Sequence, residues 1–253
     1  MSEPVLLKLG GSVVTEKRRG GTIDRLAISA IADALAEVDF AGVVVHGAGS
    51  CGHPEAHRYG LASGADRSTR TGIPVTHEAV ASLNRAVVTE LRAAGLDAVG
   101  IHPLAACTAE DGRIASFEAE PLRLLLDLGC VPVLHGDVVM DRRRGACIVS
   151  GDQLIGYLAP QLGLSRVGLV TDVPGVLDPT GAVVPRISRT GAIDLALGAS
   201  NATDVTGGMS GKIAELFQLA DMGIASHVFG SDRLADFLAG RPHGGTEIVP
   251  EGA

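Results

Sequence analysis

Short apolar segments alternate with amphipathic segments along almost the whole chain, and this alternation constrains the fold more than any other feature. The apolar segments have the length and residue types of buried strands: 5–9, 42–46, 98–102, 131–135, 166–171 and 226–229. The segments between them have the helical spacing of apolar residues: 24–38, 75–94, 118–128, 152–161, 210–222 and 233–239. The pattern predicts an α/β fold, an open and mostly parallel sheet sandwiched between helices, with ligands at the carboxyl ends of the strands.

Two pairs of short apolar segments interrupt this alternation and predict β-hairpins. Residues 138–140 face 147–149, and residues 175–177 face 183–184, each across a polar turn. At 253 residues and 46% hydrophobic, the chain can form one two-lobed unit or two small domains. We expect an N-terminal lobe over residues 1–164 and a C-terminal lobe over 165–253, where the second set of strands begins.

The chain contains three glycine-rich turns. The stretch from His46 to His53 (HGAGSCGH) ends one strand and leads to a helix that we expect to begin at Pro54; the stretches 8–17 (KLGGSVVTEK) and 204–212 (DVTGGMSGK) contain the others. Without bulky side chains, successive backbone N–H groups can converge on an anion, and the start of a helix adds its positive end. Since each turn carries a lysine or a histidine, the turns together predict one polyanion site.

The spacing Gly47-x-Gly49-x-x-Gly52 also fits the dinucleotide-binding pattern. That pattern belongs on the first strand of its domain, and an acidic residue should end the next strand about 20 residues later. Here another glycine turn comes first, and residues 66–71 do not end a strand. Phosphoryl chemistry is therefore favoured, and a dinucleotide-dependent oxidoreductase stays as an alternative.

The charge balance excludes a general affinity for polyanions. The chain has 21 Lys+Arg against 29 Asp+Glu, a formal net charge of −8, which argues against nucleic acid as the main partner. Bound phosphates must therefore be neutralised locally, by a few lysines, backbone amides and a metal ion.

The cysteines and histidines do not predict a metal centre. Cys51, Cys107, Cys130 and Cys147 are widely spaced and form no C-x-x-C pair, so neither a zinc site nor a disulfide framework is expected. His53 and His57 are four residues apart on a predicted helix, so they could supply two of the ligands of a metal site. No third ligand is evident, and we therefore predict no metal-ligating residues. No signal peptide and no membrane-spanning apolar segment is visible, which predicts a cytoplasmic protein without a membrane partner.

Physical roles follow from the type and place of the charged residues. Phosphoryl transfer requires positioning and charge neutralisation more than covalent participation. Lys8 ends an otherwise apolar strand, where a lone charge is costly to desolvate without an anionic partner, and Lys212 stands at the head of a helix. Both are expected on the transferred phosphoryl group, and Lys17 could close on the same charge. Asp152 either orients these lysines or holds Mg²⁺ through water, or else caps the helix that follows it.

The ordered set of motifs resembles the amino acid kinase superfamily, and within it the isopentenyl phosphate kinases. The matching segments span nearly the whole chain: KLGGS at 8–12 with Lys17, HGAGSCGHP at 46–54, LHGDV at 134–138, SGD at 150–152, TDVPGV at 171–176, and DVTGGM at 204–209 with Lys212. The resemblance implies an amino acid kinase-like αβα sandwich and a homodimer. It also implies direct, in-line transfer of a phosphoryl group from ATP with Mg²⁺ to a small monophosphate, isopentenyl phosphate, to form isopentenyl diphosphate.

The resemblance assigns the site residue by residue. Catalytic roles fall on Lys8, Lys17, His53, Asp152 and Lys212. The acceptor is expected at Gly47, Ala48, Gly49, Cys51, Gly52, His53 and Gly151. The ATP site is expected at Lys8, Gly10, Gly11, Ser12, Thr171, Asp172, Val176, Asp178, Gly208, Met209 and Lys212.

Two departures from the family pattern concern the acceptor. Ala48 replaces the middle glycine of the turn, and Cys51 stands where these kinases usually carry an aromatic residue. We expect the acceptor's tail near Cys51 and the helix 75–94, and we expect His53 to hold the acceptor phosphate without acting as a base. The alternatives are a kinase for another phosphate or phosphonate such as fosfomycin, and a non-catalytic nucleotide sensor.

Overall fold

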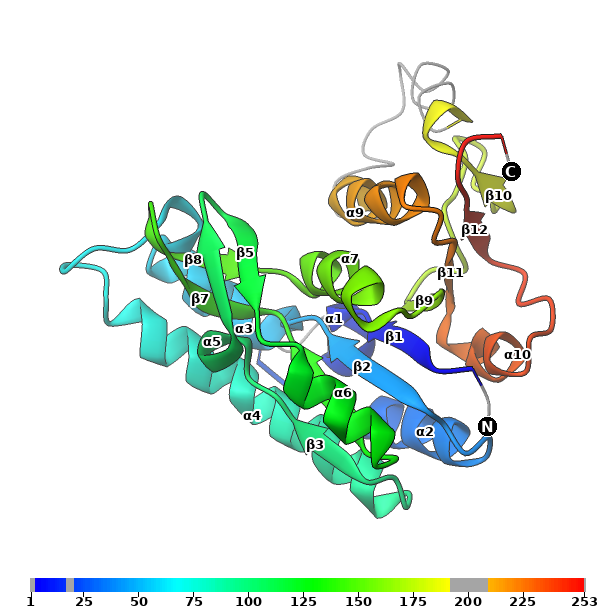
Figure 1. Ribbon diagram of the computed structural model, residues 1–253, viewed down its shortest axis with the longest axis horizontal. Helices are drawn as coiled ribbons and strands as arrows, with labels where there is room; N and C mark the ends of the chain where they lie inside the picture. The colour runs from blue at the N-terminus through cyan, green and yellow to red at the C-terminus, as the bar shows by residue number, and fades with distance from the viewer. Residues whose placement is uncertain (1–2, 17–20, 192–208, 253) are drawn as a thin grey trace.

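The computed structural model describes residues 3–16, 21–191 and 209–252, with side chains from residue 212 onward in the last range. Its main sheet has eight strands (Figure 1). In spatial order they are β10 (Arg186–Ile187), β12 (Thr246–Ile248), β11 (Ser226–Gly230), β9 (Arg166–Thr171), β1 (Val5–Leu9), β2 (Gly42–His46), β6 (Val131–His135) and β3 (Ala98–Gly100). From β11 to β3 all neighbours run parallel, whereas β12 is antiparallel to β11.

Helices cover both faces of this sheet, as the alternation predicts. One face packs against α2 (Arg25–Ala36), α4 (Gly72–Ala93) and α10 (Leu234–Leu238), and the other against α6 (Glu120–Asp127), α7 (Gly151–Leu162) and α9 (Met209–Asp221). Because side chains alternate along a strand, β1 sends Leu7 to the first face and Leu6 to the second. Both faces of β1 are therefore buried, as is typical of a central parallel strand.

A second, four-stranded sheet lies beside the first, in the order β5 (Arg113–Phe117), β4 (Cys107–Glu110), β7 (Asp137–Asp141) and β8 (Gly145–Val149). The β7–β8 pair confirms the hairpin predicted at 138–140 and 147–149. The β4–β5 hairpin was not predicted, although its Asp111-Gly112 turn has the positive φ angles, 53° and 82°, of the two-residue turn that favours this dipeptide.

The helix after β2 begins earlier than predicted. Instead of starting at Pro54, α3 runs over Gly49–Arg58 with the proline inside it. Pro54 has no N–H to donate to the carbonyl of Ser50, which lies four residues earlier. That carbonyl instead accepts from the N–H of Gly21 at 3.1 Å, so the proline leaves no buried acceptor unpaired.

The remaining elements are short. They are α1 (Gly11–Val14), α5 (Pro103–Ala106) and the 3₁₀ turns η1 (Leu61–Ser63) and η2 (Ser231–Arg233). The strand predicted at 98–102 ends at Gly100, because α5 begins at Pro103 after His102. The second predicted hairpin is reduced to a single antiparallel bridge between Leu177 and Val183.

Sheet pairing crosses the predicted lobe boundary near residue 164, because β1 pairs with β9 along its whole length. The division into two lobes stays a prediction.

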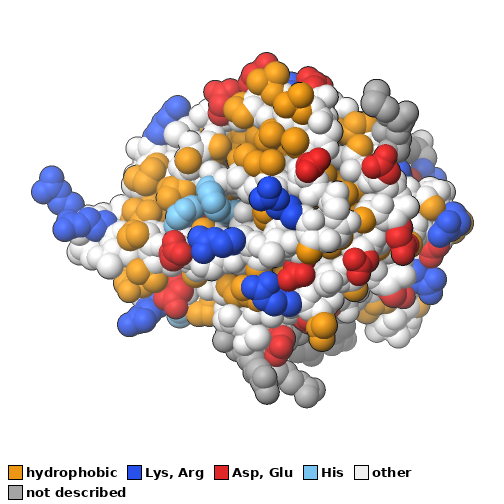
Figure 2. Space-filling model, turned by 90° about the horizontal axis from the view of Figure 1, so that it is seen from below, with side chains coloured by type: hydrophobic (Ala, Val, Ile, Leu, Met, Phe, Trp, Pro, Cys, Tyr) orange, Lys and Arg blue, Asp and Glu red, His pale blue; other side chains and the backbone are white. Residues whose placement is uncertain are grey.

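Acidic and basic side chains are interspersed on the face of the molecule shown in Figure 2. In the part of the chain that the structure describes, no helix is long and apolar enough to cross a bilayer.

Candidate active site

A cavity of about 460 Å³ opens at the carboxyl ends of β1 and β2. It is bounded by the glycine turn after β1, the glycine turn after β2 with α3, and the starts of α7 and α9. Many of the residues predicted for catalysis and binding line it: Lys8, Gly11, Ser12, Gly47, Ala48, Gly49, Gly52, His53, Gly151, Asp152 and Lys212. Segments far apart in the sequence thus meet at one site.

Lys8 and Asp152 form a nearly buried ion pair on the cavity wall. The Lys8 Nζ donates to Asp152 Oδ1 at 2.5 Å, and the two side chains are 4% and 13% exposed. The helix cap that the sequence left open for Asp152 is instead Ser150, whose hydroxyl accepts from the N–H of Gln153 at 3.1 Å. The Asp152 carboxylate is therefore free to orient Lys8.

Burial lowers the pKa of Lys8 below its usual value, and the nearby charge of Lys212 lowers it further, while Asp152 opposes both effects. Since Lys8 acts on phosphate only when protonated, we expect kcat/KM for ATP to fall on the alkaline side below pH 10.5, the ordinary lysine value. Asp152→Asn removes the negative charge that helps to keep Lys8 protonated. The alkaline fall of kcat/KM should therefore move to lower pH. Glu120→Gln, which removes a carboxylate from an exposed ion pair on α6, is the control. If the alkaline fall of kcat/KM does not move in Asp152→Asn, it reports the titration of a group other than Lys8.

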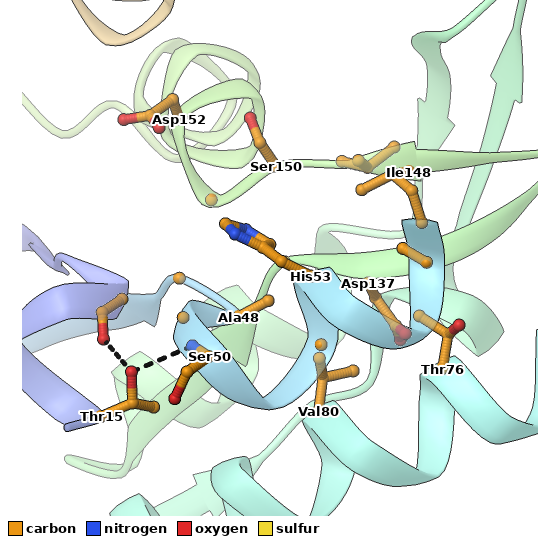
Figure 3. Close-up of a pocket in the computed structure, with 18 of the residues that line it drawn as sticks. Thr15, Ala48, Ser50, His53, Thr76, Val80, Asp137, Ile148, Ser150 and Asp152 are labelled. Atoms are coloured by element: carbon orange, nitrogen blue, oxygen red, sulfur yellow. Dashed lines mark hydrogen bonds between the residues drawn. The ribbon is translucent and has the colours of Figure 1, made fainter. Parts of the chain in front are cut away.

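The glycines of the two N-terminal turns allow their backbones to touch. A Cβ on Gly11 would lie 2.5 Å from the N of Gly49, and a Cβ on Gly47 would lie 2.8 Å from the N of Gly11. Thr15, which the sequence analysis did not select, joins the two turns (Figure 3): its hydroxyl donates to the Gly11 carbonyl at 2.8 Å and accepts from the N–H of Ser50 at 3.1 Å. The glycines therefore serve close packing as well as anion binding.

Two helices begin at this cavity, α3 at Gly49 and α7 at Gly151, and the described part of α9 reaches it through Lys212. The first N–H groups of a helix have no partner within it, and the helix dipole places partial positive charge at that end. Together with Lys8 and Lys212, these helix starts make the cavity favourable for several phosphate groups, although the whole chain is acidic.

His53 projects from α3 into the cavity. Figure 3 shows its ring pointing toward the start of α7, where Ser150 and Asp152 lie. The side chain is exposed. A ring N–H here can donate to a phosphate oxygen seated between α3 and α7.

Behind His53, the cavity wall is formed by Thr76 and Val80 of α4, Ile148 of β8 and Asp137 of β7 (Figure 3). Cys51, which was predicted to contact the acceptor, does not line the cavity. Its thiol donates to the carbonyl of Gly21 at 3.6 Å and packs against the α2 side of the core. The earlier start of α3 sets this orientation, because it fixes the helical phase of each residue in the turn.

Buried polar groups support this wall. The Asp137 carboxylate, which is fully buried, accepts from His77 Nδ1 at 3.0 Å and from the N–H groups of Leu104 and Val138. Burial raises its pKa to about 6. His46 and His135 stack with their rings 5.6 Å apart, and burial lowers their pKa values to about 4 and about 2, so both are neutral structural groups.

Several residues predicted for ATP lie beside the cavity without lining it. Thr171 ends β9 and Asp172 follows it, next to the first glycine turn. Gly10 donates its N–H to the Val170 carbonyl at 2.8 Å, and Ser12 donates to the Asp172 carboxylate at 2.8 Å. Farther along the chain, Val176 is buried, and Asp178 accepts hydrogen bonds within its own turn. Lys17 and Gly208 lie outside the described residues, as does the side chain of Met209.

Comparisons with known proteins show the family to which this fold belongs. The model of the amino acid kinase family matches residues 3–230. Isopentenyl phosphate kinase from Haloferax volcanii is 44% identical over 242 residues, which cover 95% of this chain and 96% of that protein. The enzyme of the same name from Methanothermobacter thermautotrophicus is 39% identical and covers 88% of this chain and 90% of its own length.

Solved structures give the same result. An X-ray structure of isopentenyl phosphate kinase has a TM-score of 0.85 and 34% identity, over 97% of this chain and 100% of that one. The product complex of the T. acidophilum isopentenyl phosphate kinase has a TM-score of 0.78 and 25% identity, over 97% and 99%. The chain therefore belongs to the amino acid kinase family and, within it, to the isopentenyl phosphate kinases.

Proposed function

We propose that this protein transfers the terminal phosphoryl group of ATP to isopentenyl phosphate and releases isopentenyl diphosphate and ADP. The observation that carries the proposal is the cavity itself, where Lys8, Lys212 and Asp152 face the glycine turn that bears His53. Cationic side chains thus lie beside a second anion-binding turn, as transfer between two phosphates requires. The named relatives supply the identity of the acceptor.

The acceptor phosphate is placed on the turn 47–52, where the start of α3 and the ring of His53 hold it. Its second pKa is about 6, so at neutral pH a terminal oxygen is already an anionic nucleophile. The ATP phosphates lie across the cavity at Lys8, Lys212 and the first glycine turn, where Gly11 and Ser12 line the cavity. Because the two polyanions repel each other, the lysines lower the barrier by neutralising charge on the transferring group and by fixing its direction.

The five-carbon tail lies against Val80 and the methyl group of Thr76, on the helix expected from the sequence, and against Ile148 in place of Cys51. The aliphatic surface of Val80, Ile148 and the Thr76 methyl group suits an acceptor whose tail has no polar group. The tail has no hydrogen-bonding group with which to fix its direction, so the shape of this wall determines the length that fits.

Mg²⁺, a homodimer and a cytoplasmic location complete the proposal. Among the described residues, no group of three His, Cys, Asp or Glu side chains is placed to hold a metal ion. Mg²⁺ would therefore arrive with ATP, keeping its phosphate and water ligands, and Asp152 is the carboxylate on the cavity wall that could contact it through water. The family resemblance supports the homodimer. The four free cysteines support a reducing compartment.

A panel of acceptors tests the function directly. The purified protein with Mg-ATP should phosphorylate isopentenyl phosphate faster than fosfomycin or acetylglutamate, measured by ADP release and by ³¹P NMR of the product. A higher kcat/KM for fosfomycin would assign the site to a phosphonate. ATP binding without turnover of any acceptor would favour the nucleotide sensor.

Ile148→Phe tests the position of the tail. A larger side chain on this wall should lower kcat/KM for isopentenyl phosphate about tenfold or more, because overpacking costs about 1–3 kcal/mol. Methyl phosphate, which does not reach the wall, should change much less. Cys51→Ser, outside the cavity, is the matched control and should preserve the ranking of the acceptors. Equal losses for short and long acceptors in Ile148→Phe would place the tail elsewhere.

A further inference from the structure

The β4–β5 hairpin, which no sequence motif marked, contacts both helices that bring charged groups to the cavity. On the α7 side, the amide of Gln153 bonds the hairpin twice: its Oε1 accepts from the N–H of Ile114 and its Nε2 donates to the carbonyl of Gly112, both at 3.1 Å. On the α9 side, Arg113 forms a bidentate ion pair with Glu215. The tip of the hairpin thus joins α7 to α9.

Glu215 depends on this contact. Its side chain is only 11% exposed and lies against α7, where a Cβ on Gly156 would be 3.4 Å from Glu215 Oε2. A carboxylate in such a place costs several kcal/mol to desolvate unless it is paired. In the described part of the chain, the guanidinium of Arg113 supplies the ion pair, with one nitrogen on each carboxylate oxygen. A bidentate pair also fixes direction, which a single contact does not.

Both attachment points lie next to groups that face the cavity. Glu215 follows Lys212 by three residues, so the two side chains lie on one face of α9, one turn apart. Gln153 immediately follows Asp152 in the first turn of α7. A shift of the hairpin would therefore be transmitted to Lys212 and to the Lys8–Asp152 pair, although the hairpin itself does not line the cavity.

We propose that the β4–β5 hairpin is a positioning element for phosphoryl transfer, and that Arg113, through Glu215, sets the place of Lys212 over the cavity. The inference rests on the proposed function. Arg113 touches neither substrate. It is a positioning residue that acts through α9, and Gln153 does the same for α7.

A double-mutant cycle between Arg113 and Lys212 tests this role. Arg113→Ala should lower kcat roughly tenfold and raise KM for ATP, because a displacement of about 1 Å in a positioning element costs up to about 10²-fold. KM for isopentenyl phosphate, which binds at the α3 turn, should stay unchanged. In the Lys212→Ala background, adding Arg113→Ala should change kcat less than about twofold, because the group on which Arg113 acts is already absent.

Two further variants separate positioning from stability. Arg143→Ala removes a nearby arginine whose exposed ion pair with Glu110 involves no residue of α7 or α9. This variant should leave kcat unchanged. Arg113→Lys keeps the charge but cannot bond both oxygens in the same geometry, so it should show an intermediate loss. It also provides the measurement if Arg113→Ala does not fold.

If Arg113→Ala lowers kcat equally in the wild-type and Lys212→Ala backgrounds, Arg113 has a merely structural role and the inference is overturned. No loss of kcat in the wild-type background would also overturn it. If the wild-type protein does not turn over isopentenyl phosphate, the proposed function fails. In that case the dissociation constant of ATP is measured by calorimetry for the same four proteins of the double-mutant cycle. Arg113→Ala should weaken ATP when Lys212 is present and have no effect when it is absent; any other pattern rejects the positioning role.

Discussion

Lys8→Ala and Lys212→Ala should each lower kcat by about 10²- to 10³-fold, the usual loss when one preorganised contact to a developing charge is removed. Both residues face the cavity, and their charges are close enough that Lys212 lowers the pKa of Lys8. Two like charges held this close, with Asp152 paired to Lys8, favour a bound anion between them, so we expect both lysines to act on the transferring phosphoryl group. The measurement is single-turnover transfer from ATP to isopentenyl phosphate, since it isolates the chemical step from product release.

Lys8 requires a second variant, because it is buried and paired. Lys8→Ala leaves Asp152 without its partner, but that side chain is 13% exposed and can be hydrated. Lys8→Met keeps the length of the stem without the charge, and it should lose as much activity as Lys8→Ala. Arg25→Ala, in an exposed ion pair with Glu90, is the control for removal of a distant cation. Near-normal turnover in a folded Lys8→Met protein would remove Lys8 from the transfer step.

His53→Ala should lose most of the activity on isopentenyl phosphate, whereas His53→Gln should keep a substantial part of it. Glutamine retains an N–H donor near the place of the histidine ring but cannot serve as a base at neutral pH. A phosphate acceptor requires a donor that holds a non-reacting oxygen, and it requires no base, because its nucleophilic oxygen is already ionised. The two substitutions therefore distinguish positioning from proton transfer.

The pH dependence of kcat tests the role of His53 independently. If His53 only positions the acceptor, His53→Gln should retain the pH profile of the wild-type kcat above the second pKa of the phosphate, about 6. His57→Gln, which changes a histidine of the same helix that does not line the cavity, is the matched control. A folded His53→Gln protein that binds ATP but is as inactive as His53→Ala would instead assign proton transfer to His53.

Much of the site could be predicted from the sequence because its signals are local. A lone lysine in the apolar strand 5–9 implies an anionic partner, and the structure provides it in Asp152. A glycine turn between strand and helix implies close backbone approach, which the contact between Gly11 and Gly49 confirms. The order of these motifs along the chain was specific enough to indicate the family, which the comparisons confirm.

Side-chain directions near the acceptor were not predictable in the same way. Cys51 lies within the correct turn, but the helix starts at Gly49 instead of Pro54, and this turns the thiol toward Gly21. The phase of α3 depends on its packing against the first glycine turn and on the Gly21 N–H that pairs the Ser50 carbonyl. Both partners come from another part of the chain, so no local pattern records them.

The sequence by itself determined the layered α/β fold and the glycine turns that meet at the cavity, because hydrophobic periodicity and glycine-rich turns are properties of neighbouring residues. Only the tertiary structure decided which side chains meet. Arg113 and Glu215 are 102 residues apart, and in the sequence each alone is an ordinary charged residue. Their pairing exists because the β4–β5 hairpin and α9 are brought together over α7, and such a contact is a property of the packed core and not of either segment.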